Sequence, residues 1–103
     1  MADFMKILQQ AQEMQGKFQK LQEELQQQTV RASSGGGMVT VEANGQGTMR
    51  SIKIDPSVVN AADVAMLEDL VLVAVTEAQK KAQEIAQQEM GKLTGGLPFK
   101  LPF

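Results

Sequence analysis

The stretch SSGGGMVTVEANGQG, residues 33–47, holds five of the nine glycines in this chain of 103 residues. Glycines at this density either wrap a phosphate group with backbone N–H groups or turn the chain between strands. A P-loop also needs a Lys-Ser or Lys-Thr pair, which the sequence lacks. A dinucleotide fingerprint opens a helix, whereas Gly47 precedes another strand-like segment. The stretch therefore predicts the turns of a small sheet.

The residues around these glycines alternate between apolar and polar side chains, as strands do. In the segment before Gly45, the apolar side chains of Val39, Val41 and Ala43 share one face. In the segment after it, Ile52 and Ile54 share a face, and Met49, Ser51 and Lys53 fall on the opposite one. We expect three antiparallel strands, at 30–32, 38–43 and 48–54.

The glycines also predict how the second and third strands pair. A two-residue turn at Gly45-Gln46 sets Val39 opposite Ile52, and a turn centred on Asn44-Gly45 shifts this register by one pair while keeping the same faces. A slip of a single residue would instead set Val39 against Ser51 and lose the apolar face. Both allowed turns place glycine where a primed turn requires a positive φ.

A long helix is predicted over 3–28. Its apolar residues recur at spacings of 3 and 4, which is a heptad seam. The seam consists of Phe4, Ile7, Ala11, Met14, Phe18, Leu21 and Leu25. A helix of this length measures about 38 Å, and short strands cover only about half of that. The uncovered half must meet another helix.

A second long helix is predicted over 61–90, with Asn60 or Asp63 as its N-cap and Gly91 as its stop. Its segment Leu70–Val75 is apolar on every side, and one sheet with one helix cannot cover it. We therefore expect a subunit interface there, with a polar second half that projects. The predicted interface residues are Leu67, Leu70, Val71, Val73 and Ala74.

The composition excludes most catalytic chemistry. The chain has no Cys and no His, so disulfides, thiol nucleophiles, Ser-His-Asp triads and nearly all transition-metal sites are ruled out. The carboxylates form no acid–base constellation. We predict no catalytic residue, no cofactor, no metal site and no small-molecule substrate, so the protein should not be an enzyme. With no signal peptide and no apolar run near the roughly 20 residues of a membrane span, we expect a soluble cytoplasmic protein.

The distribution of charge is more informative than the net charge of −2. The sheet region carries three cations against one carboxylate, and lysines follow on the second helix. Each could simply decorate a solvated surface, and several of the helical charges form i,i+4 pairs, namely Glu13–Lys17, Lys20–Glu24, Glu77–Lys81 and Lys80–Glu84. A dimer would double every basic patch and could form a phosphate-binding surface. The candidate DNA-binding residues are Arg31, Arg50, Lys53, Lys80, Lys81 and Lys92.

Any such binding should be electrostatic. No aromatic side chains lie among these cations to stack on single strands, and no recognition-helix pattern is present. Sequence reading should therefore be slight.

The order of these segments resembles the YbaB/EbfC family of bacterial nucleoid-associated proteins. The segments that carry the resemblance are MKILQQAQEM (5–14), GGGMV (35–39), NG (44–45), IKIDP (52–56), LEDL (67–70), AVTEA (74–78) and MGKLTGG (90–96). Two departures are Thr76, where relatives often carry Asn, and the tail after Gly96.

The resemblance implies an α+β subunit of order α-β-β-β-α in an intertwined homodimer with projecting, tweezer-like helices. It also implies double-stranded DNA as the partner, in the nucleoid, with roles in chromosome organisation and transcription regulation. We expect one domain over 1–96 and a loosely ordered tail over 97–103, whose two Pro-Phe pairs could alternatively dock on a surface. The competing interpretation is a protein-interaction adaptor that acts through its long helices.

Overall fold

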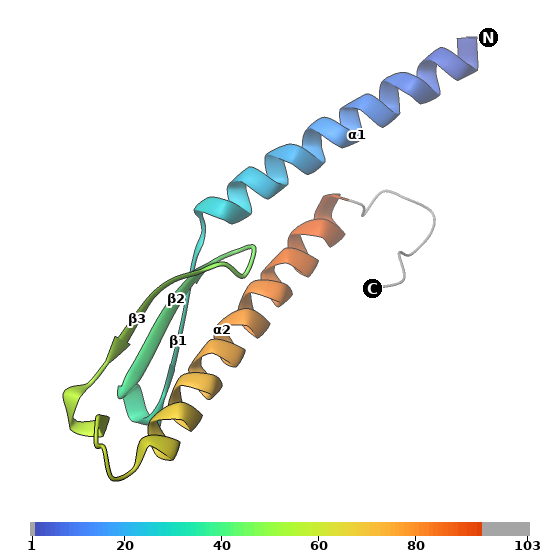
Figure 1. The fold of residues 1–103 in the computed structure, drawn as a ribbon. Helices are drawn as coiled ribbons and strands as arrows, with labels where there is room; N and C mark the ends of the chain where they lie inside the picture. The colour runs from blue at the N-terminus through green and yellow to red at the C-terminus, as the bar shows by residue number, and fades with distance from the viewer. Residues whose placement is uncertain (1, 94–103) are drawn as a thin grey trace.

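The structure, a computed structural model, describes residues 2–93, so the predictions made for 97–103 lie outside the described residues (Figure 1). Helix α1 precedes a three-stranded antiparallel sheet of order β1-β2-β3, and helix α2 follows it. Two short 3-10 turns occupy Gly35–Gly37 and Pro56–Val58. The bounds are α1 Ala2–Gln27, β1 Thr29–Ser34, β2 Val39–Asn44, β3 Met49–Ile54 and α2 Val64–Leu93. The predicted α-β-β-β-α order is confirmed.

The core lies between α2 and one face of the sheet. Val39 and Val41 of β2 are 0% and 1% exposed, and they pack against Ala74 and Ala78 of α2. These alanines recur every four residues, so they lie on one face of the helix and let it approach the sheet closely. α2 runs mainly over β1 and β2, and it leaves the same face of β3 largely uncovered.

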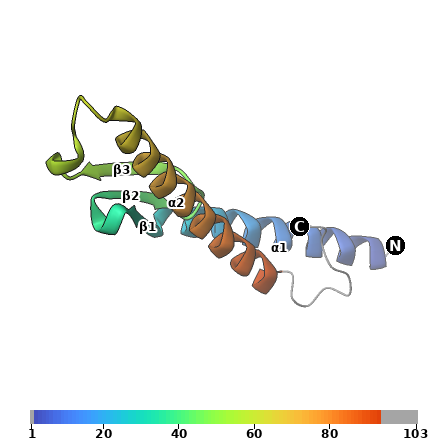
Figure 2. The same ribbon diagram turned by 90° about the horizontal axis from the view of Figure 1, so that it is seen from below.

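Helix α1 extends well beyond the sheet (Figures 1 and 2). Near its C-terminal end Leu21 and Leu25 are buried, whereas Phe4 and Ile7 are 67% and 63% exposed. The longest dimension of the described chain is 72 Å. The prediction that the sheet covers only part of this helix is confirmed.

The β2–β3 register differs from both predicted versions. Val39 lies opposite Ile54, and the pairing shifts between Glu42 and Ala43, where β3 contributes one extra residue. The cause is the side chain of Asn44, whose Oδ1 accepts hydrogen bonds from the N–H groups of Gln46 and Thr48 at 2.9 and 3.0 Å. This lengthens the turn beyond two residues.

The extra residue is a β-bulge, and it reverses which side chains face the core beyond it. Met49 pairs with Ala43 and packs against the core cluster. The prediction that Met49 faces away from the core was therefore wrong. Alternation along β3 could not indicate this, because a bulge interrupts the period of two.

The ends of α2 resolve two further predictions. Asp63 is the N-cap, because its Oδ1 accepts a hydrogen bond from the N–H of Met66 at 3.2 Å. Asn60 acts one turn earlier, where it accepts from Ala62. Gly91 does not stop the helix, which continues to Leu93 without a positive φ at this glycine. Glycine lowers helix stability by only about 1 kcal/mol, so it does not end a helix by itself.

Candidate nucleic-acid interface

Two predicted cations from distant parts of the chain meet at the edge of the sheet. Lys81 of α2 donates from Nζ to the backbone oxygen of Arg31 in β1 at 2.9 Å, across 50 residues of sequence. Lys81 reaches this edge because α2 lies over β1. The contact neutralises neither charge, so the β1 edge carries two positive side chains.

The outer face of the sheet, opposite α2, is polar. Arg31 and Glu42 lie opposite each other in the β1–β2 register, and the guanidinium contacts Glu42 Oε1 through Nη2 and, at 3.1 Å, through Nε. The side chain of Arg31 is still 68% exposed. Lys53 lies opposite Thr40, and its side chain makes no hydrogen bond or ion pair with any of residues 2–93. This face therefore carries two cations and one carboxylate.

Arg50 has a structural contact. It is the extra residue of the bulge, and its Nη2 donates to the backbone oxygen of Gln26, at the end of α1. The last carbonyls of a helix lack intrahelical partners and attract a cation. Arg50 thereby ties β3 to α1, and its exposed charge is directed to that helix end.

A third group of charges lies between the two helices. An open hollow of about 280 Å³ separates α1 from the end of α2 and is lined by three lysines, two glutamates and two leucines. Lys92 pairs with Glu89 at 3.4 Å. The lining residues are Lys17, Lys20, Leu21, Glu24, Glu89, Lys92 and Leu93.

Lys17 and Lys20 were missed as candidates, because the sequence assigned them to i,i+4 ion pairs. None of the four predicted i,i+4 pairs forms; the ion pairs within the described chain are Arg31–Glu42 and Lys92–Glu89. The sequence did contain a signal for Lys17 and Lys20: they are three residues apart, which places both lysines on one side of the helix. Lys80 of α2 is likewise exposed and unpaired within residues 2–93.

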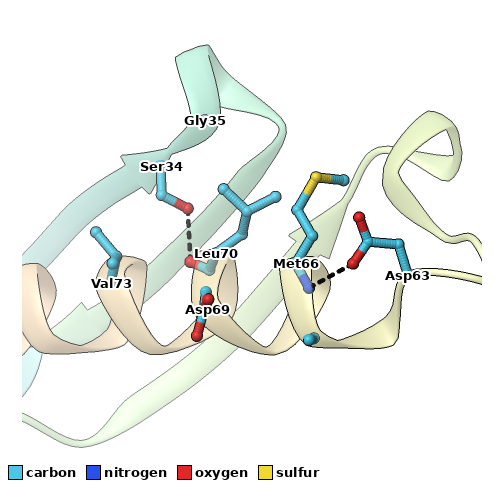
Figure 3. Close-up of a pocket in the computed structure, with 8 residues that line it drawn as sticks. Ser34, Gly35, Asp63, Met66, Asp69, Leu70 and Val73 are labelled. Atoms are coloured by element: carbon cyan, nitrogen blue, oxygen red, sulfur yellow. Dashed lines mark hydrogen bonds between the residues drawn. The ribbon is translucent and has the colours of Figure 1, made fainter.

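The glycine stretch forms part of a different pocket, shown in Figure 3. Ser34 donates its hydroxyl to the backbone oxygen of Leu70 at 2.6 Å, and Asp63 and Asp69 line the same pocket. Gly35 has φ +59°, and a Cβ there would lie 2.8 Å from Leu70 Cδ2. The glycine permits close contact with α2, and the two carboxylates make the pocket unsuited to phosphate.

The predicted interface residues fall into different environments. Leu67, Leu70 and Val71 are half-buried against the core cluster, and Ala74 is fully buried within it. Val73 is 51% exposed. The sheet thus covers one side of the apolar segment Leu70–Val75, and the remainder of this segment stays open in the single chain.

Neither a metal site nor a membrane span is found over residues 2–93. No three carboxylates there are placed to hold an ion together. No helix in this range has both the length and the hydrophobicity to cross a membrane.

Exposed cations on a sheet face, a sheet edge and two long helices define a small α+β protein whose surface suits a polyanion. Residues 1–97 match the model of the YbaB/EbfC DNA-binding family. The chain belongs to this family, which is named for binding DNA and not for a reaction.

Individual relatives agree with this assignment. A nucleoid-associated protein of Gemmatimonas aurantiaca is 53% identical over 98% of this chain and 99% of its own. One from Thermodesulfovibrio yellowstonii is 59% identical over 96% of this chain and 85% of its own. Among solved structures, an uncharacterized protein from Helicobacter pylori matches with a TM-score of 0.82 at 25% identity, over 89% of this chain and 97% of that one.

Proposed function

We propose that this protein is a nucleoid-associated protein that binds double-stranded DNA as a homodimer with little sequence specificity. It would act in the cytoplasm, within the nucleoid, and contribute to chromosome organisation and gene regulation. The observation that carries the proposal is the distribution of its exposed cations, which lie on the strands and on the sides of the two helices. Within residues 2–93 they do not gather on a recognition helix that could read bases in a groove. The family membership and the names of the relatives support the same function.

Binding of this kind rests on contacts to phosphate. Lys53 and Lys80 offer charges that no group within residues 2–93 neutralises. Lys81 adds one more at the sheet edge, where the charge of Arg31 is paired with Glu42. Phosphate contacts position a protein on the duplex without reading its bases. Each one releases counterions, so affinity falls steeply as salt rises.

The dimer would form on the uncovered part of the sheet. Ile52 and Ile54 of β3 are 47% and 37% exposed, although they share a face with the buried valines of β2. Val75 of α2 lines the adjacent hollow with Met49 and Ile52. Leu72, one turn before Val75, is 65% exposed. We call this surface the β3 shelf; its residues are Met49, Ile52, Ile54, Leu72 and Val75.

A second copy is the occupant that fits the β3 shelf. Sheet and helix both present apolar side chains there, and a two-sided apolar corner of this kind is the part of a subunit that a partner usually buries. A homodimer would also repeat every basic group, which is the feature that a weakly charged chain needs for phosphate binding. Val73 lies on the other flank of α2, beside Ser34.

The DNA proposal is tested by anisotropy titrations with two duplexes of unrelated sequence. We expect tight binding at about 50 mM salt that weakens strongly by about 200 mM. The variants Lys53→Gln and Lys80→Gln should each weaken both duplexes equally, and Lys6→Gln, at an exposed position on α1, is the control with the same change of charge. No binding by a confirmed dimer at low salt would overturn the proposal, and loss on one sequence alone would overturn the mechanism.

The dimer is tested by light scattering on Leu72→Glu and Val73→Glu. The two residues are branched apolar residues of α2, and they are 65% and 51% exposed, respectively. Burying a glutamate in the β3 shelf should cost several kcal/mol, so Leu72→Glu should give monomers while Val73→Glu stays dimeric. The reverse pattern would move the interface to the other flank of α2. Dimers in both variants would exclude this part of the helix.

The adaptor interpretation rests on one specific observation, the exposed apolar side chains of α1 such as Phe4 and Ile7. It would gain support from a stoichiometric protein partner that stays bound after nuclease treatment. The DNA proposal needs no such partner.

A further inference from the structure

The heptad seam of α1 is only half covered. Leu21 and Leu25 are 7% and 2% exposed where they meet the sheet region, and the same seam continues outward through Phe18, Ile7 and Phe4 at 41%, 63% and 67%. We call the part from Phe4 to Phe18 the open seam. Large exposed apolar surfaces usually mark a binding site.

The end of α2 lies beside the start of the open seam. Leu93, the last residue of α2, lines the same hollow as Lys17 and Leu21 of α1. Ten residues follow Leu93 in the sequence, and an extended chain of that length reaches about 33 Å. Going back along α1 from Leu21 to Phe4 takes about 26 Å. The following segment is therefore long enough to run the whole length of the open seam.

The sequence of that segment suits an apolar groove. In LPFKLPF, residues 97–103, Leu97, Phe99, Leu101 and Phe103 alternate with two prolines and one lysine. Proline and the residue before it favour extended backbone. In extended chain, side chains two residues apart share a face at intervals of about 6.6 Å. Four such side chains span about 20 Å, and the open seam from Phe4 to Phe18 spans about 21 Å.

We propose that residues 97–103 of this chain dock in extended form on the open seam of its own α1, running from Phe18 towards Phe4. Thr94, Gly95 and Gly96 lie between Leu93 and this segment in the sequence, and glycine is a residue type that favours turns. Docking removes apolar side chains of both partners from water, which is the main force available to a segment without strand partners. The contact would fix how α1 sits against α2. It requires neither DNA nor a second copy.

The test uses tryptophan fluorescence, because the chain has no Trp and no Tyr. Phe99→Trp places a single reporter in the segment. We expect its emission to be blue-shifted relative to the free peptide LPWKLPF, and independent of protein concentration. Adding Ile7→Gln, which removes an apolar side chain from the open seam, should return the emission to that of the peptide.

Met5→Gln is the matched control. Met5 is 65% exposed, close to the 63% of Ile7, but it lies about 160° away around the helix. This variant should leave the blue shift unchanged. Circular dichroism verifies that all variants stay folded.

Four results would overturn the proposal. The first is emission equal to that of the free peptide, and the second is an equal effect of Ile7→Gln and Met5→Gln. The third is a blue shift that disappears on dilution, which would show docking on another copy. The fourth is a change in the oligomeric mass of the Ile7→Gln variant while its tryptophan emission stays constant. This would mean that the α1 of a second copy covers the open seam.

Discussion

The backbone N–H of Gly45 donates to the carbonyl oxygen of Leu25 at 2.7 Å, so the β2–β3 turn is held directly against the last turns of α1. A Cβ at position 45 would lie 2.7 Å from that same oxygen and 3.1 Å from Leu25 Cα. This glycine of the opening stretch is therefore required for close approach, without any ligand.

Gly45→Ala should destabilise the protein by about 1–3 kcal/mol, because the methyl group meets rigid backbone. Gly16→Ala is the opposite case, since nothing lies within 4 Å of its Cβ position and its φ is ordinary. That change should stabilise by about 0.5–1 kcal/mol. Urea unfolding of both variants measures the difference; a neutral Gly45→Ala would show that the turn does not pack tightly on α1.

Ala78→Leu should lower the free energy of unfolding by about 1–3 kcal/mol or more. Ala78 is fully buried between α2 and the sheet, and a larger side chain forces the two layers apart. Ala65→Leu, on an exposed position of the same helix, should change stability by less than about 0.5 kcal/mol. Thermal unfolding compares the two, and equal effects would contradict the assigned packing face.

Glu42→Gln should strengthen DNA binding. It releases Arg31 from its ion pair on the outer face of the sheet, while the lost surface pair lowers stability by no more than about 1 kcal/mol. Glu68→Gln removes the same charge from an unpaired, exposed position on α2. A larger gain and a steeper salt dependence for Glu42→Gln are expected; identical gains would place the outer sheet face away from DNA.

The variants Arg50→Gln and Lys53→Gln test whether Arg50 stabilises the fold while Lys53 binds DNA. Arg50 contacts the end of α1, so its loss should lower stability by about 0.5–1.5 kcal/mol. Lys53 has no partner within residues 2–93, so its loss should reduce DNA affinity at unchanged stability. Unfolding curves and anisotropy titrations on the same samples give both quantities. A stability loss in Lys53→Gln would contradict this division.

Asp55 should titrate below its ordinary value of 3.8. The backbone N–H of Ser57, at 2.9 Å from Oδ1, lowers the pKa of this carboxyl first, and the Ser57 hydroxyl lowers it further. Because the folded pKa lies below the unfolded one, this contribution to stability is present above the unfolded pKa and is lost as pH falls through the folded pKa. Asp55→Asn should flatten the acid limb of the stability profile; a carboxyl titration by NMR at or above 3.8 would contradict the contact.

The elements of the fold could be predicted because each depends on a short-range period. The heptad spacing of Phe4 to Leu25 and the alternation of Val39, Val41 and Ala43 act over neighbouring residues only. Both are confirmed. The β2–β3 register could not be predicted, because Asn44 adds side-chain hydrogen bonds to its turn and a bulge follows at Arg50.

The candidate site was predicted by residue type and not by arrangement. The sequence indicated which side chains were cationic, but Lys81 beside Arg31 and Lys17 beside Lys92 depend on how α2 lies over the sheet and against α1. The same packing separates Arg50, which holds the end of α1, from Lys53, which stays unpaired. The DNA contacts stay predictions, and so does the dimer interface, which our proposal moves from the α2 residues predicted from the sequence to the β3 shelf.

By itself, the sequence determined the helix–sheet–helix order, the presence of turns within residues 33–47, though not the type of the β2–β3 turn, and the family, because these follow from local periodicity and from motifs in a fixed order. Only the tertiary structure decided the pairing of β3, the neighbours of each cation, and which apolar side chains remain uncovered. These depend on contacts across up to 50 residues, where the packing of one surface on another selects among arrangements that a single strand or helix leaves equally open.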